Sequence, residues 1–463
     1  MTESRSTRSL RWLLMLLTGI SLNSAGFADG PDHTHEFSQG RELSATPAVL
    51  PLRERPAVEN RMLIDRLETL LPKLMRETGI DMWLVVAREY AEDPVYFTLV
   101  PQPAHAARRT TMLIFDLQDD GLVERLTVNR YPLGAPYTST WAGGELDAQW
   151  QALGDLIRAR DPRRIGINVS RDWPVADGLT HALHQRLLEV LDDEQQRKLV
   201  SAEDLVIRWF ETRSAMELAV YPQVVALARS VIAEAFSNAV ITPGVTTTDD
   251  VAWFIAGRFS ELNLPIWFQP YVNYQRPGGQ CTADDPFCGD NGIIMPGDVL
   301  HTDVGICYLK LCTDTQEMGY VLRSGEDDVP PGLVAALATG NRWQDLLTGE
   351  FETGRSGNRI FERALQASRE TGIQASIYTH PVGMFGHAPG PGMGMWDKQA
   401  PLPILGARHL FANTAYAIEG NIKQAVPEWD GLFVAIKLEQ SAWFDGENVI
   451  YLAGRQTRWH VIR

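Results

Sequence analysis

Two acidic residues, Asp303 and Asp314, interrupt an apolar and β-branched stretch between residues 297 and 319. Residues 308–310 lie between them and are typical of a turn, so the stretch is predicted to form an antiparallel hairpin. Side chains alternate between the two faces of a strand, and a turn at this point can bring both carboxylates to one face. Two carboxylates held side by side repel each other unless a proton or a cation intervenes. The hairpin therefore predicts a metal-binding pair. For the hairpin taken alone, two solvated acids are the alternative.

Glu419 and Glu439 each interrupt an apolar run that is typical of a strand, at residues 416–422 and 432–444. An unpaired carboxylate inside such a strand is costly to bury, although an exposed pair between Lys437 and Glu439, which share a face, is the alternative for the second strand. His387 lies in a glycine-rich turn, where the backbone can approach a bound group closely. Four carboxylates and one imidazole have the composition of a two-metal hydrolase site, in which two divalent cations balance the four charges and supply a hydroxide nucleophile. The oxygen-rich ligand set favours Mn²⁺, with Zn²⁺ and Co²⁺ as alternatives.

The first 28 residues have the pattern of a secretory signal peptide. Arg5, Arg8 and Arg11 precede an apolar run at residues 12–20, and Gly26 and Ala28 are small residues suited to a cleavage site. The apolar run is shorter than the roughly 20 residues that a membrane anchor needs. The protein is therefore predicted to be secreted, to a bacterial periplasm, with no membrane anchor in the mature chain.

The elements that follow predict an α/β (α+β) protein of two domains. Residues 29–58 contain several prolines and are predicted to be a flexible leader. Residues 59–212 alternate between helical patterns (61–78, 146–159, 175–191) and strand patterns (82–86, 112–115, 122–128, 165–169), which indicates a mixed sheet covered by helices. Ser214 and Glu217 form a capping-box pattern that opens a long helix and a second domain, residues 213–463, with further helices at 249–262, 333–347 and 358–370. The net charge of −16 argues against nucleic-acid binding.

The four cysteines are Cys281, Cys288, Cys307 and Cys312. An even number in an oxidising compartment predicts disulfides, and the two local pairings, 281 with 288 and 307 with 312, are favoured. Cys307 and Cys312 lie on opposite arms of the predicted hairpin, as diagonal or directly opposite neighbours. Two buried free thiols are the alternative for this pair. The spacings between the four cysteines along the chain are unlike those of cysteine ligands in zinc sites.

The order of these acids and the histidine resembles the methionine aminopeptidase, prolidase and creatinase family, metallopeptidase family M24. The second Asp follows the first by eleven positions (314 − 303), and His, Glu and Glu come after it. The matching pieces are residues 297–305, 313–316, 386–390, 417–420 and 437–439. The resemblance implies a pita-bread domain over residues 213–463 and a smaller creatinase-type domain before it. It also implies a homodimer and the cleavage of Xaa-Pro bonds through a metal-bridged hydroxide. The metal ligands would be Asp303, Asp314, His387, Glu419 and Glu439.

The sequence departs from this family at three places. The family usually carries a His about seventeen residues before the first Asp, which falls near Pro286, and an Arg two residues before the last Glu, where Lys437 stands. A second His usually follows the ligand His by about seven residues, and Trp396 lies near that place. Trp396 and Lys437 are therefore candidates for substrate binding. His301 and His380 are candidates to replace the missing histidines in catalysis, with a packing or ligand-orienting role as the alternative.

Glu419 and Glu439 are also candidates to carry a proton to the leaving amine. The alternatives to an Xaa-Pro peptidase are a creatinase-like hydrolase of a non-peptide C–N substrate and a metal-binding homologue without turnover.

Overall fold

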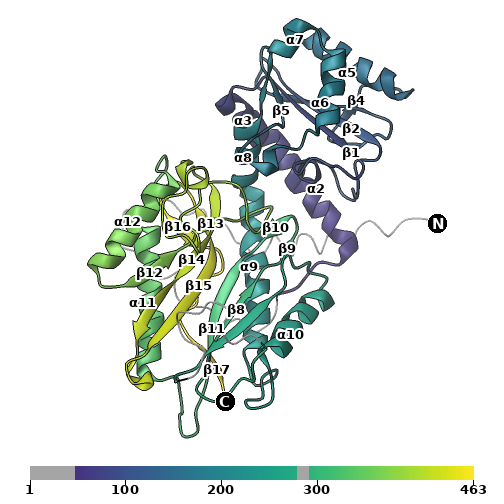
Figure 1. The fold of residues 1–463 in the computed structure, drawn as a ribbon. Coiled ribbons are helices and arrows are strands. Elements are labelled where there is room, and N and C mark those ends of the chain that lie inside the picture. Colours follow the sequence, from purple (N-terminus) through teal and green to yellow (C-terminus); the bar gives the residue numbers. More distant parts are fainter. Residues whose placement is uncertain (1–46, 279–290) are drawn as a thin grey trace, which may run out of the picture. The chain divides into compact units, whose positions relative to one another are not determined.

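A computed structural model describes residues 47–278 and 291–463 (Figure 1). The predicted signal peptide, most of the predicted leader, and Cys281, Cys288 and Pro286 lie outside the described residues. All the described residues belong to one compact unit. This unit contains a six-stranded sheet, a nine-stranded sheet and a separate two-stranded hairpin. We refer to residues 47–212 as the N-terminal region and to residues 213–463 as the C-terminal region.

The N-terminal region is built on the six-stranded sheet, whose strand order is β4-β3-β2-β1-β5-β6. β1, β2 and β3 pair antiparallel, whereas β5 and β6 continue parallel to β1, so the sheet is mixed as predicted. Odd-numbered side chains of β1 pack with α2, α3 and α8, and even-numbered ones pack with α5 and α6. Burial on both faces explains why these strands read as unbroken apolar runs. The bounds are β1 Met82–Arg88, β2 Thr110–Leu117, β3 Val123–Asn129, β4 Thr138–Ser139, β5 Ile165–Ile167, β6 Leu199–Ser201, α2 Arg55–Asp65, α3 Leu71–Thr78, α4 Tyr96–Leu99, α5 Leu146–Arg160, α6 His181–Val190, α7 Asp193–Arg197 and α8 Glu203–Glu211.

Two predicted ranges in this region differ from the structure by more than shifts of one or two residues at the ends of an element. α2 begins at Arg55, inside the range predicted as a flexible leader, and Pro56 lies in its first turn, where the missing proline N–H leaves no hydrogen bond unmade. The helix predicted at 175–191 is a short 3-10 turn, η3 (Pro174–Ala176), followed by α6. Between them Gly178 lies against the carboxyl group of Asp93, where there is no room for a Cβ atom.

The C-terminal region is built on the nine-stranded sheet, whose main path is β12-β14-β15-β11-β8-β7. β13 pairs with β14, β16 with β15, and β17 with β11. α9 and α10 pack on the part of the sheet that contains β7 and β8, and α11 and α12 pack on the part that contains β14 and β15 (Figure 1). The bounds are β7 Tyr271–Gln275, β8 Val299–Val304, β11 Thr315–Val321, β12 Gln374–Ile377, β13 His380–Pro381, β14 Thr414–Ala425, β15 Phe433–Phe444, β16 Val449–Tyr451, β17 His460–Ile462, α9 Ala215–Ala235, α10 Thr248–Glu261, α11 Pro331–Thr348 and α12 Gly357–Glu370. The predicted mixed α/β class is confirmed.

α9 begins where the capping box predicts. Ser214 Oγ accepts from the backbone N–H of Glu217 at 3.3 Å, and Glu217 Oε2 accepts from the backbone N–H of Ser214 at 2.8 Å. The same Glu217 oxygen is 2.8 Å from Arg66 Nη1, and both side chains are 1% exposed. This buried ion pair joins the two regions across the predicted boundary at residues 212 and 213. Among the described helices, α9 is the one long and apolar enough to cross a membrane, and half of its apolar window is buried in the fold.

The C-terminal strand β17 is held to β11 by a buried ion triad. Glu317 Oε1 is 2.5 Å from Arg229 Nε of α9, and Glu317 Oε2 is 2.5 Å from His460 Nε2. The Glu317 side chain is 1% exposed. Burial alone would raise the pKa of this carboxyl group, but the arginine and the histidine lower it to about 2. The triad therefore stabilises the fold as long as Glu317 is ionised.

Candidate metal centre

One row of paired residues crosses five strands of the C-terminal sheet. Asp303 of β8 pairs with Tyr271 of β7 and with Gln316 of β11, Gln316 pairs with Glu439 of β15, and Glu439 pairs with Glu419 of β14. Directly paired residues in antiparallel strands project from the same face of a sheet. The pairing therefore gathers three carboxylates that are far apart in the sequence into one line.

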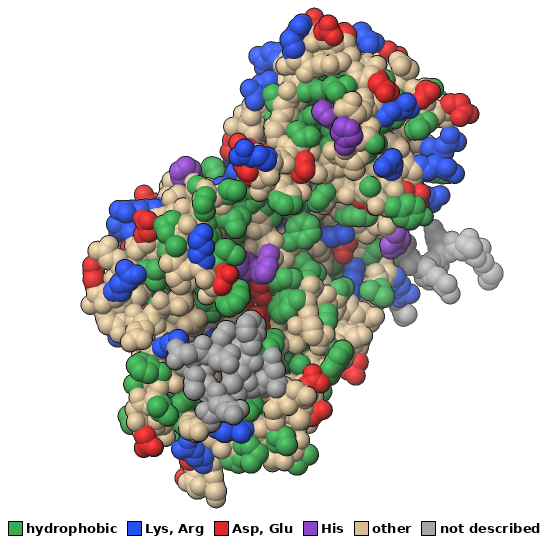
Figure 2. Space-filling view, viewed as in Figure 1, with side chains coloured by type: hydrophobic (Ala, Val, Ile, Leu, Met, Phe, Trp, Pro, Cys, Tyr) green, Lys and Arg blue, Asp and Glu red, His purple; other side chains and the backbone are tan. Residues whose placement is uncertain are grey.

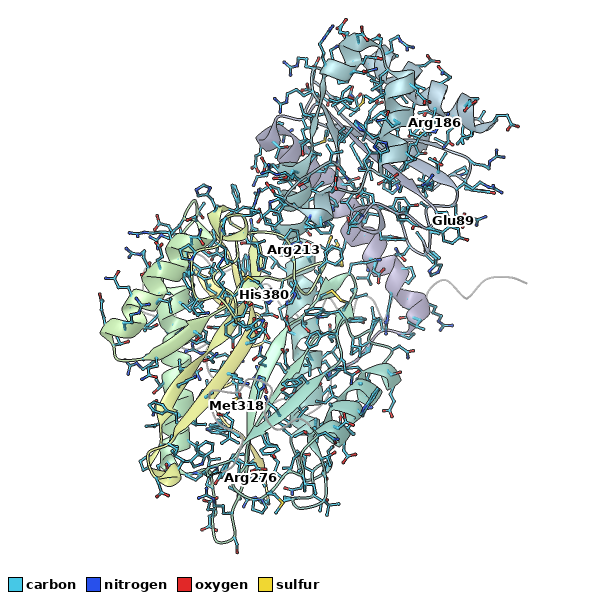
Figure 3. All side chains as sticks on the ribbon, viewed as in Figure 1. Glu89, Arg186, Arg213, Arg276, Met318 and His380 are labelled. Atoms are coloured by element: carbon cyan, nitrogen blue, oxygen red, sulfur yellow. A yellow bond between two sulfur atoms is a disulfide. The ribbon has the colours of Figure 1, made fainter. Side chains whose placement is uncertain are left out.

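Asp314 and His380 complete this group. Asp314 precedes Gln316 by two positions, which gives it the same face. His380 lies on the short strand β13 and pairs with Ala417 of β14, two residues from Glu419. Its Nε2 is 3.5 Å from Asp314 Oδ2, 3.6 Å from Glu419 Oε2 and 3.6 Å from Glu439 Oε1. Figure 3 shows His380 over this sheet, with Met318 of β11 further along it.

Burial and mutual repulsion both act on the carboxylates. The side chains of Asp314 and Glu439 are 5% and 1% exposed, and that of Glu419 is 14% exposed. Burial, and then the neighbouring carboxylates, raise the pKa of Asp303 and of Glu419 well above the ordinary range, and the same causes raise the pKa of Glu439. Burial alone would lower the pKa of His380, but contact with Asp314 and Glu419 raises it to about 9. The cluster is therefore short of positive charge.

Several buried polar atoms of the cluster support the binding of cations. Asp303 Oδ1, Asp314 Oδ1, Glu439 Oε1 and His380 Nε2 have no hydrogen-bond partner among the described residues. Unpaired buried polar atoms are uncommon in folded proteins, and a missing ion is one cause. Three overlapping sets of these side chains, which together contain all four carboxylates and both His380 and His387, place ligand atoms within 4.8 Å of one another. The residues present therefore fit a divalent metal centre.

The profile of Metallopeptidase family M24 matches residues 221–441. This C-terminal part of the chain therefore resembles family M24. The X-Pro aminopeptidase from Thermotoga maritima MSB8 has a similar structure, with a TM-score of 0.59 at 16% identity over 84% of this chain and 99% of that one. An Xaa-Pro dipeptidase from Bacillus anthracis has a TM-score of 0.56 at 15% identity over 88% and 100% of the two chains. A prolidase from Pyrococcus horikoshii OT3 has a TM-score of 0.54 at 13% identity over 86% and 99%. No curated protein sequence matches the chain.

These likenesses confirm the predicted resemblance to family M24 and the predicted fold. The solved structures are covered almost completely by this chain, so the similarity extends beyond residues 221–441 into the N-terminal region. The creatinase-type N-terminal domain predicted from the sequence agrees with this coverage. At these identities the likeness concerns the fold.

The structure distinguishes two histidines, His380 and His387, as candidates for the histidine of the ligand set. His387, the predicted ligand, lies 3.9 Å from Asp314 Oδ2 and its side chain is 73% exposed. His380 contacts three carboxylates and is 17% exposed. The geometry therefore favours His380 as the histidine of the ligand set, in place of His387. His387 then follows it by seven residues (387 − 380), which is the spacing expected for the second family histidine, so Trp396 need not fill that place.

His387 lies at the open side of the cluster, next to two other rings. Its ring centre is 4.6 Å from that of His380 and 4.9 Å from that of Trp267. Burial and the nearby His380 lower the pKa of His387 below its ordinary value. Figure 2 shows histidine and acidic side chains next to each other, with hydrophobic side chains around them. An accessible imidazole in this position can exchange hydrogen bonds with a ligand in the cavity.

His301, the other catalytic candidate, is 4% exposed and lies on β8, two residues before Asp303. Its Nε2 is 2.8 Å from Gln316 Oε1, and its Nδ1 is 3.2 Å from Asn273 Oδ1. Burial, and then Lys437, lower its pKa well below the ordinary value. His301 therefore contacts the amide of Gln316, which in turn contacts the carboxylates of Glu419 and Glu439. This arrangement suits a residue that orients metal ligands rather than one that contacts the substrate. Sequence reasoning missed Gln316 and Asn273, whose amides carry no charge to mark them.

A cavity of about 1130 Å³ opens over the cluster. Its floor contains Asp303, His380 and Glu419, and its walls include both predicted substrate-binding residues, Trp396 and Lys437. Trp396 is 58% exposed. The apolar part of the wall comes from both regions of the chain and contains Trp173, Pro174, Val175, Phe385, Pro389 and Met395. The cavity thus combines an acidic floor with an apolar wall.

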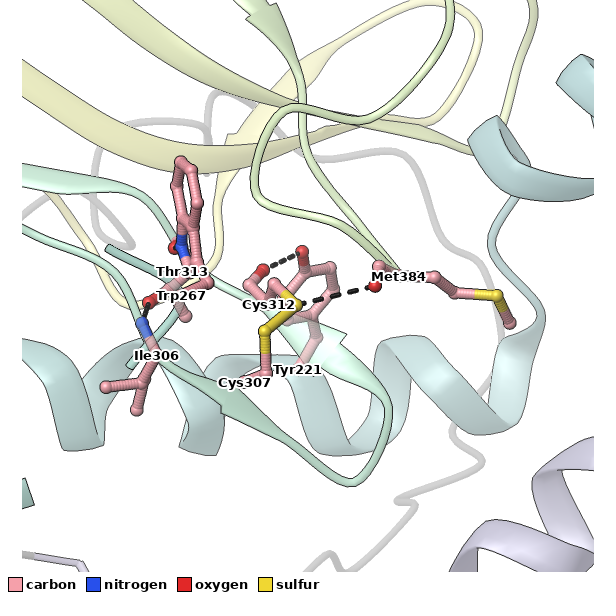
Figure 4. The surroundings of a disulfide bond; sticks show 7 residues. All are labelled: Tyr221, Trp267, Ile306, Cys307, Cys312, Thr313 and Met384. Atoms are coloured by element: carbon pink, nitrogen blue, oxygen red, sulfur yellow. Dashed lines mark hydrogen bonds between the residues drawn. A yellow bond between two sulfur atoms is a disulfide. The ribbon is translucent and has the colours of Figure 1, made fainter. Parts of the chain in front are cut away.

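A disulfide joins Cys307 and Cys312 (Figure 4), and Cys312 precedes Asp314 of the carboxylate cluster by two residues. The two residues pair directly in the hairpin of β9 (Cys307–Tyr308) and β10 (Leu311–Cys312), and the turn residues Leu309 and Lys310 have φ values of 53° and 63°. Tyr221 donates to the Cys312 carbonyl at 2.6 Å, and the Cys312 N–H donates to the Gly383 carbonyl at 2.6 Å. The hairpin therefore ties the segment before Asp314 to the loop that leads to His387.

Proposed function

We propose that this chain is a metal-dependent peptidase that cleaves Xaa-Pro bonds. The observation that carries the proposal is the contact of His380 Nε2 with Asp314, Glu419 and Glu439 at 3.5–3.6 Å in a domain of family M24. Such a domain, with a cavity above the cluster, supports hydrolysis more strongly than simple metal storage.

The proposed ligands are Asp303, Asp314, His380, Glu419 and Glu439, for two divalent cations with Mn²⁺ favoured. Oxygen-rich ligand sets of this kind suit Mn²⁺. When bound, such cations polarise a scissile carbonyl and activate water as a nucleophile. Glu419 is the proposed proton carrier, because its side chain is 14% exposed to the cavity whereas Glu439 is 1% exposed.

The apolar wall of the cavity supports proline as the residue after the scissile bond. The amide nitrogen of an Xaa-Pro bond carries no hydrogen and its ring is apolar. Such a ring is held by apolar contact, and Phe385 and Pro389 on the wall can provide it. His387 Nε2 can hydrogen-bond the substrate at the edge of the cluster. Lys437 shares a strand face with Glu439 and is proposed to attract the carboxylate of a short peptide.

We also propose that the protein is exported to a periplasm and forms a homodimer. The N-terminal residues 1–28 and the Cys307–Cys312 disulfide are consistent with export to an oxidising compartment. The homodimer is proposed from the family resemblance. Light scattering tests it, and a monomer at micromolar concentration would contradict it.

The decisive experiment measures metal content and substrate range together. The purified protein is stripped with a chelator, reloaded with Mn²⁺, and assayed on Xaa-Pro dipeptides, longer Xaa-Pro peptides, matched Xaa-Ala peptides and creatine. We expect Mn²⁺-dependent cleavage of Xaa-Pro substrates over their Xaa-Ala controls. Hydrolysis of creatine alone would favour a creatinase-like enzyme, and metal binding without any turnover would favour a non-catalytic homologue.

A further inference from the structure

The face of the sheet that carries the glutamates continues beyond them and changes its charge. Two positions after Glu419, Asn421 of β14 pairs with Lys437 of β15. Two positions further, Lys423 pairs with Ala435. Positions two apart on a strand share a face, and all four of these later residues line the cavity. The two lysines therefore form a basic strip that leads along the cavity away from the metal centre.

The charges that line the cavity are separated by sign along the sheet. Among the described residues of the cavity wall, the acidic ones are Asp303 and Glu419, both in the metal centre. Apart from the histidines, the basic ones are Lys423 and Lys437 of the strip. A chain of net charge −16 repels an anionic ligand, so such a ligand needs local positive charge to bind. The strip supplies that charge at one end of the cavity.

We propose that Lys423 binds a negative group of the substrate two residues beyond the one whose carboxylate Lys437 attracts. Positions two apart on a strand are separated by about 7 Å, and an extended peptide advances about 3.3–3.6 Å per residue. One step along the strip therefore corresponds to two residues of substrate. If Lys437 lies opposite the carboxylate of an Xaa-Pro dipeptide, Lys423 lies opposite the C-terminal carboxylate of a tetrapeptide. The substrate class is then short anionic peptides, an inference that rests on the proposed function.

Two kinds of group can supply the negative charge at Lys423. One is the terminal carboxylate of a tetrapeptide, and the other is an acidic side chain at the same residue of a longer peptide. A lysine ammonium group is a point charge on a flexible stem, so it accepts either. The residue between the two lysines is neutral: Asn421 donates from its amide to the Tyr378 hydroxyl at 3.1 Å. The strip therefore reads charge at two separate distances from the metal centre.

The test compares four substrates on the Mn²⁺-loaded protein: Ala-Pro, Ala-Pro-Ala-Ala, the C-terminal amide of that tetrapeptide, and the amide of Ala-Pro-Ala-Asp. The release of alanine gives kcat/KM. We expect the tetrapeptide acid to exceed its amide by about fivefold, the upper value of an ion pair open to solvent. An aspartyl amide equal to the acid would assign the site to any negative group, and one equal to the neutral amide would assign it to the terminal carboxylate. Equal kcat/KM for all three tetrapeptides would overturn the proposal.

Variants of Lys423 assign the preference to this side chain. Lys423→Met should abolish the preference for the tetrapeptide acid over its amide, Lys423→Arg should keep it, and Lys423→Glu should reverse it. Lys73→Met is the matched control, because Lys73 is an exposed lysine of α3 that lies 3.7 Å from Glu77, outside the cavity wall. It removes the same charge from the chain and should keep the preference. An unchanged preference in Lys423→Met, or an equal loss in Lys73→Met, would overturn the proposal.

A binding measurement separates this inference from the proposed function. Calorimetry with the tripeptide Pro-Ala-Ala and with its amide needs no turnover, since both lack the residue before proline. The unmodified protein should bind the acid about fivefold more tightly than the amide, and Lys423→Met should bind both equally. If no Xaa-Pro peptide is cleaved, the proposed function is wrong. Cleavage of Xaa-Pro peptides with equal binding of acid and amide would leave the proposed function in place and refute the role of Lys423.

Discussion

Replacing His380 with Ala should weaken divalent-cation binding much more than replacing His387 with Ala. His380 Nε2 lies 3.5–3.6 Å from three carboxylates in a site where its own side chain is 17% exposed. Removing a group that only orients metal ligands already costs about 10- to 100-fold in metal affinity, so losing a side chain that itself contacts the ligand cluster should cost at least ~100-fold. His387 Nε2 lies 3.9 Å from one carboxylate and its side chain is 73% exposed. A contact between exposed charged groups contributes at most about 1 kcal/mol. Losing it should therefore change the affinity for the cation by roughly fivefold at most.

Calorimetric titration of the metal-free variants with MnCl₂ measures both losses. His181→Ala, an exposed histidine of α6 in the N-terminal region, is the control for removing an imidazole without touching the centre. The expected ranking is a large loss for His380→Ala, a small one for His387→Ala and none for His181→Ala. His387→Ala should nevertheless lower kcat/KM on Xaa-Pro peptides, because its ring faces the cavity. The reverse ranking, with the larger affinity loss at His387, would refute the reassignment of the ligand.

Three further predictions concern stability. The pKa of Glu317 is lowered from 4.5 to about 2. The contribution of ionised Glu317 to the stability of the fold is therefore complete above pH 4.5 and is lost as the pH falls toward 2. Glu317→Gln should therefore cost about 3 kcal/mol in urea unfolding at pH 7 and much less at pH 2.5; an equal cost at both would contradict the triad. Reducing the Cys307–Cys312 bond opens a loop of six residues and should cost about 2 kcal/mol, whereas alkylation of both cysteines without reduction would disprove the bond. Burial raises the pKa of Asp93 from 3.8 to about 6, so its ionisation should remove about 3 kcal/mol of stability as the pH rises from 4 to 7. The free energy of unfolding of Asp93→Asn should therefore lack this decrease between pH 4 and 7. Identical pH profiles of stability for the variant and the unmodified protein would refute the prediction.

Much of the fold was predictable because its signals are local. The capping box at Ser214 and Glu217 marked the start of α9, and the apolar runs marked β1, β2, β14 and β15. The errors have local causes as well. Pro56 looked like a leader residue because a proline in the first turn of a helix is compatible with either state. Gly178 separates η3 from α6 through a contact with Asp93, and no sequence pattern shows that contact.

The candidate site was predictable to the extent that charge marks it. Four acids inside apolar strands stand out in the sequence, and the structure brings all four together. The choice between His380 and His387 was not predictable in the same way, since both lie next to glycine- and proline-containing turns. What separates them is that His380 lies on β13 and pairs with Ala417 of β14. Gln316 was missed because its role depends on Glu419 and Glu439, which follow it by more than one hundred positions in the chain.

The register of the sheet connects the stability of the fold to the metal centre. Glu419 and Glu439 are paired, and so are their neighbours Ile418 with Gln440 and Gly420 with Leu438. Ile418 and Leu438 are fully buried in the cluster that packs against α11 and α12. Because side chains alternate, slipping β15 by one residue would turn Leu438 to the cavity and drive Glu439 into that apolar core. The apolar face therefore enforces the pairing that lines up the carboxylates on the opposite face, and its burial offsets the cost of holding the four carboxylates together.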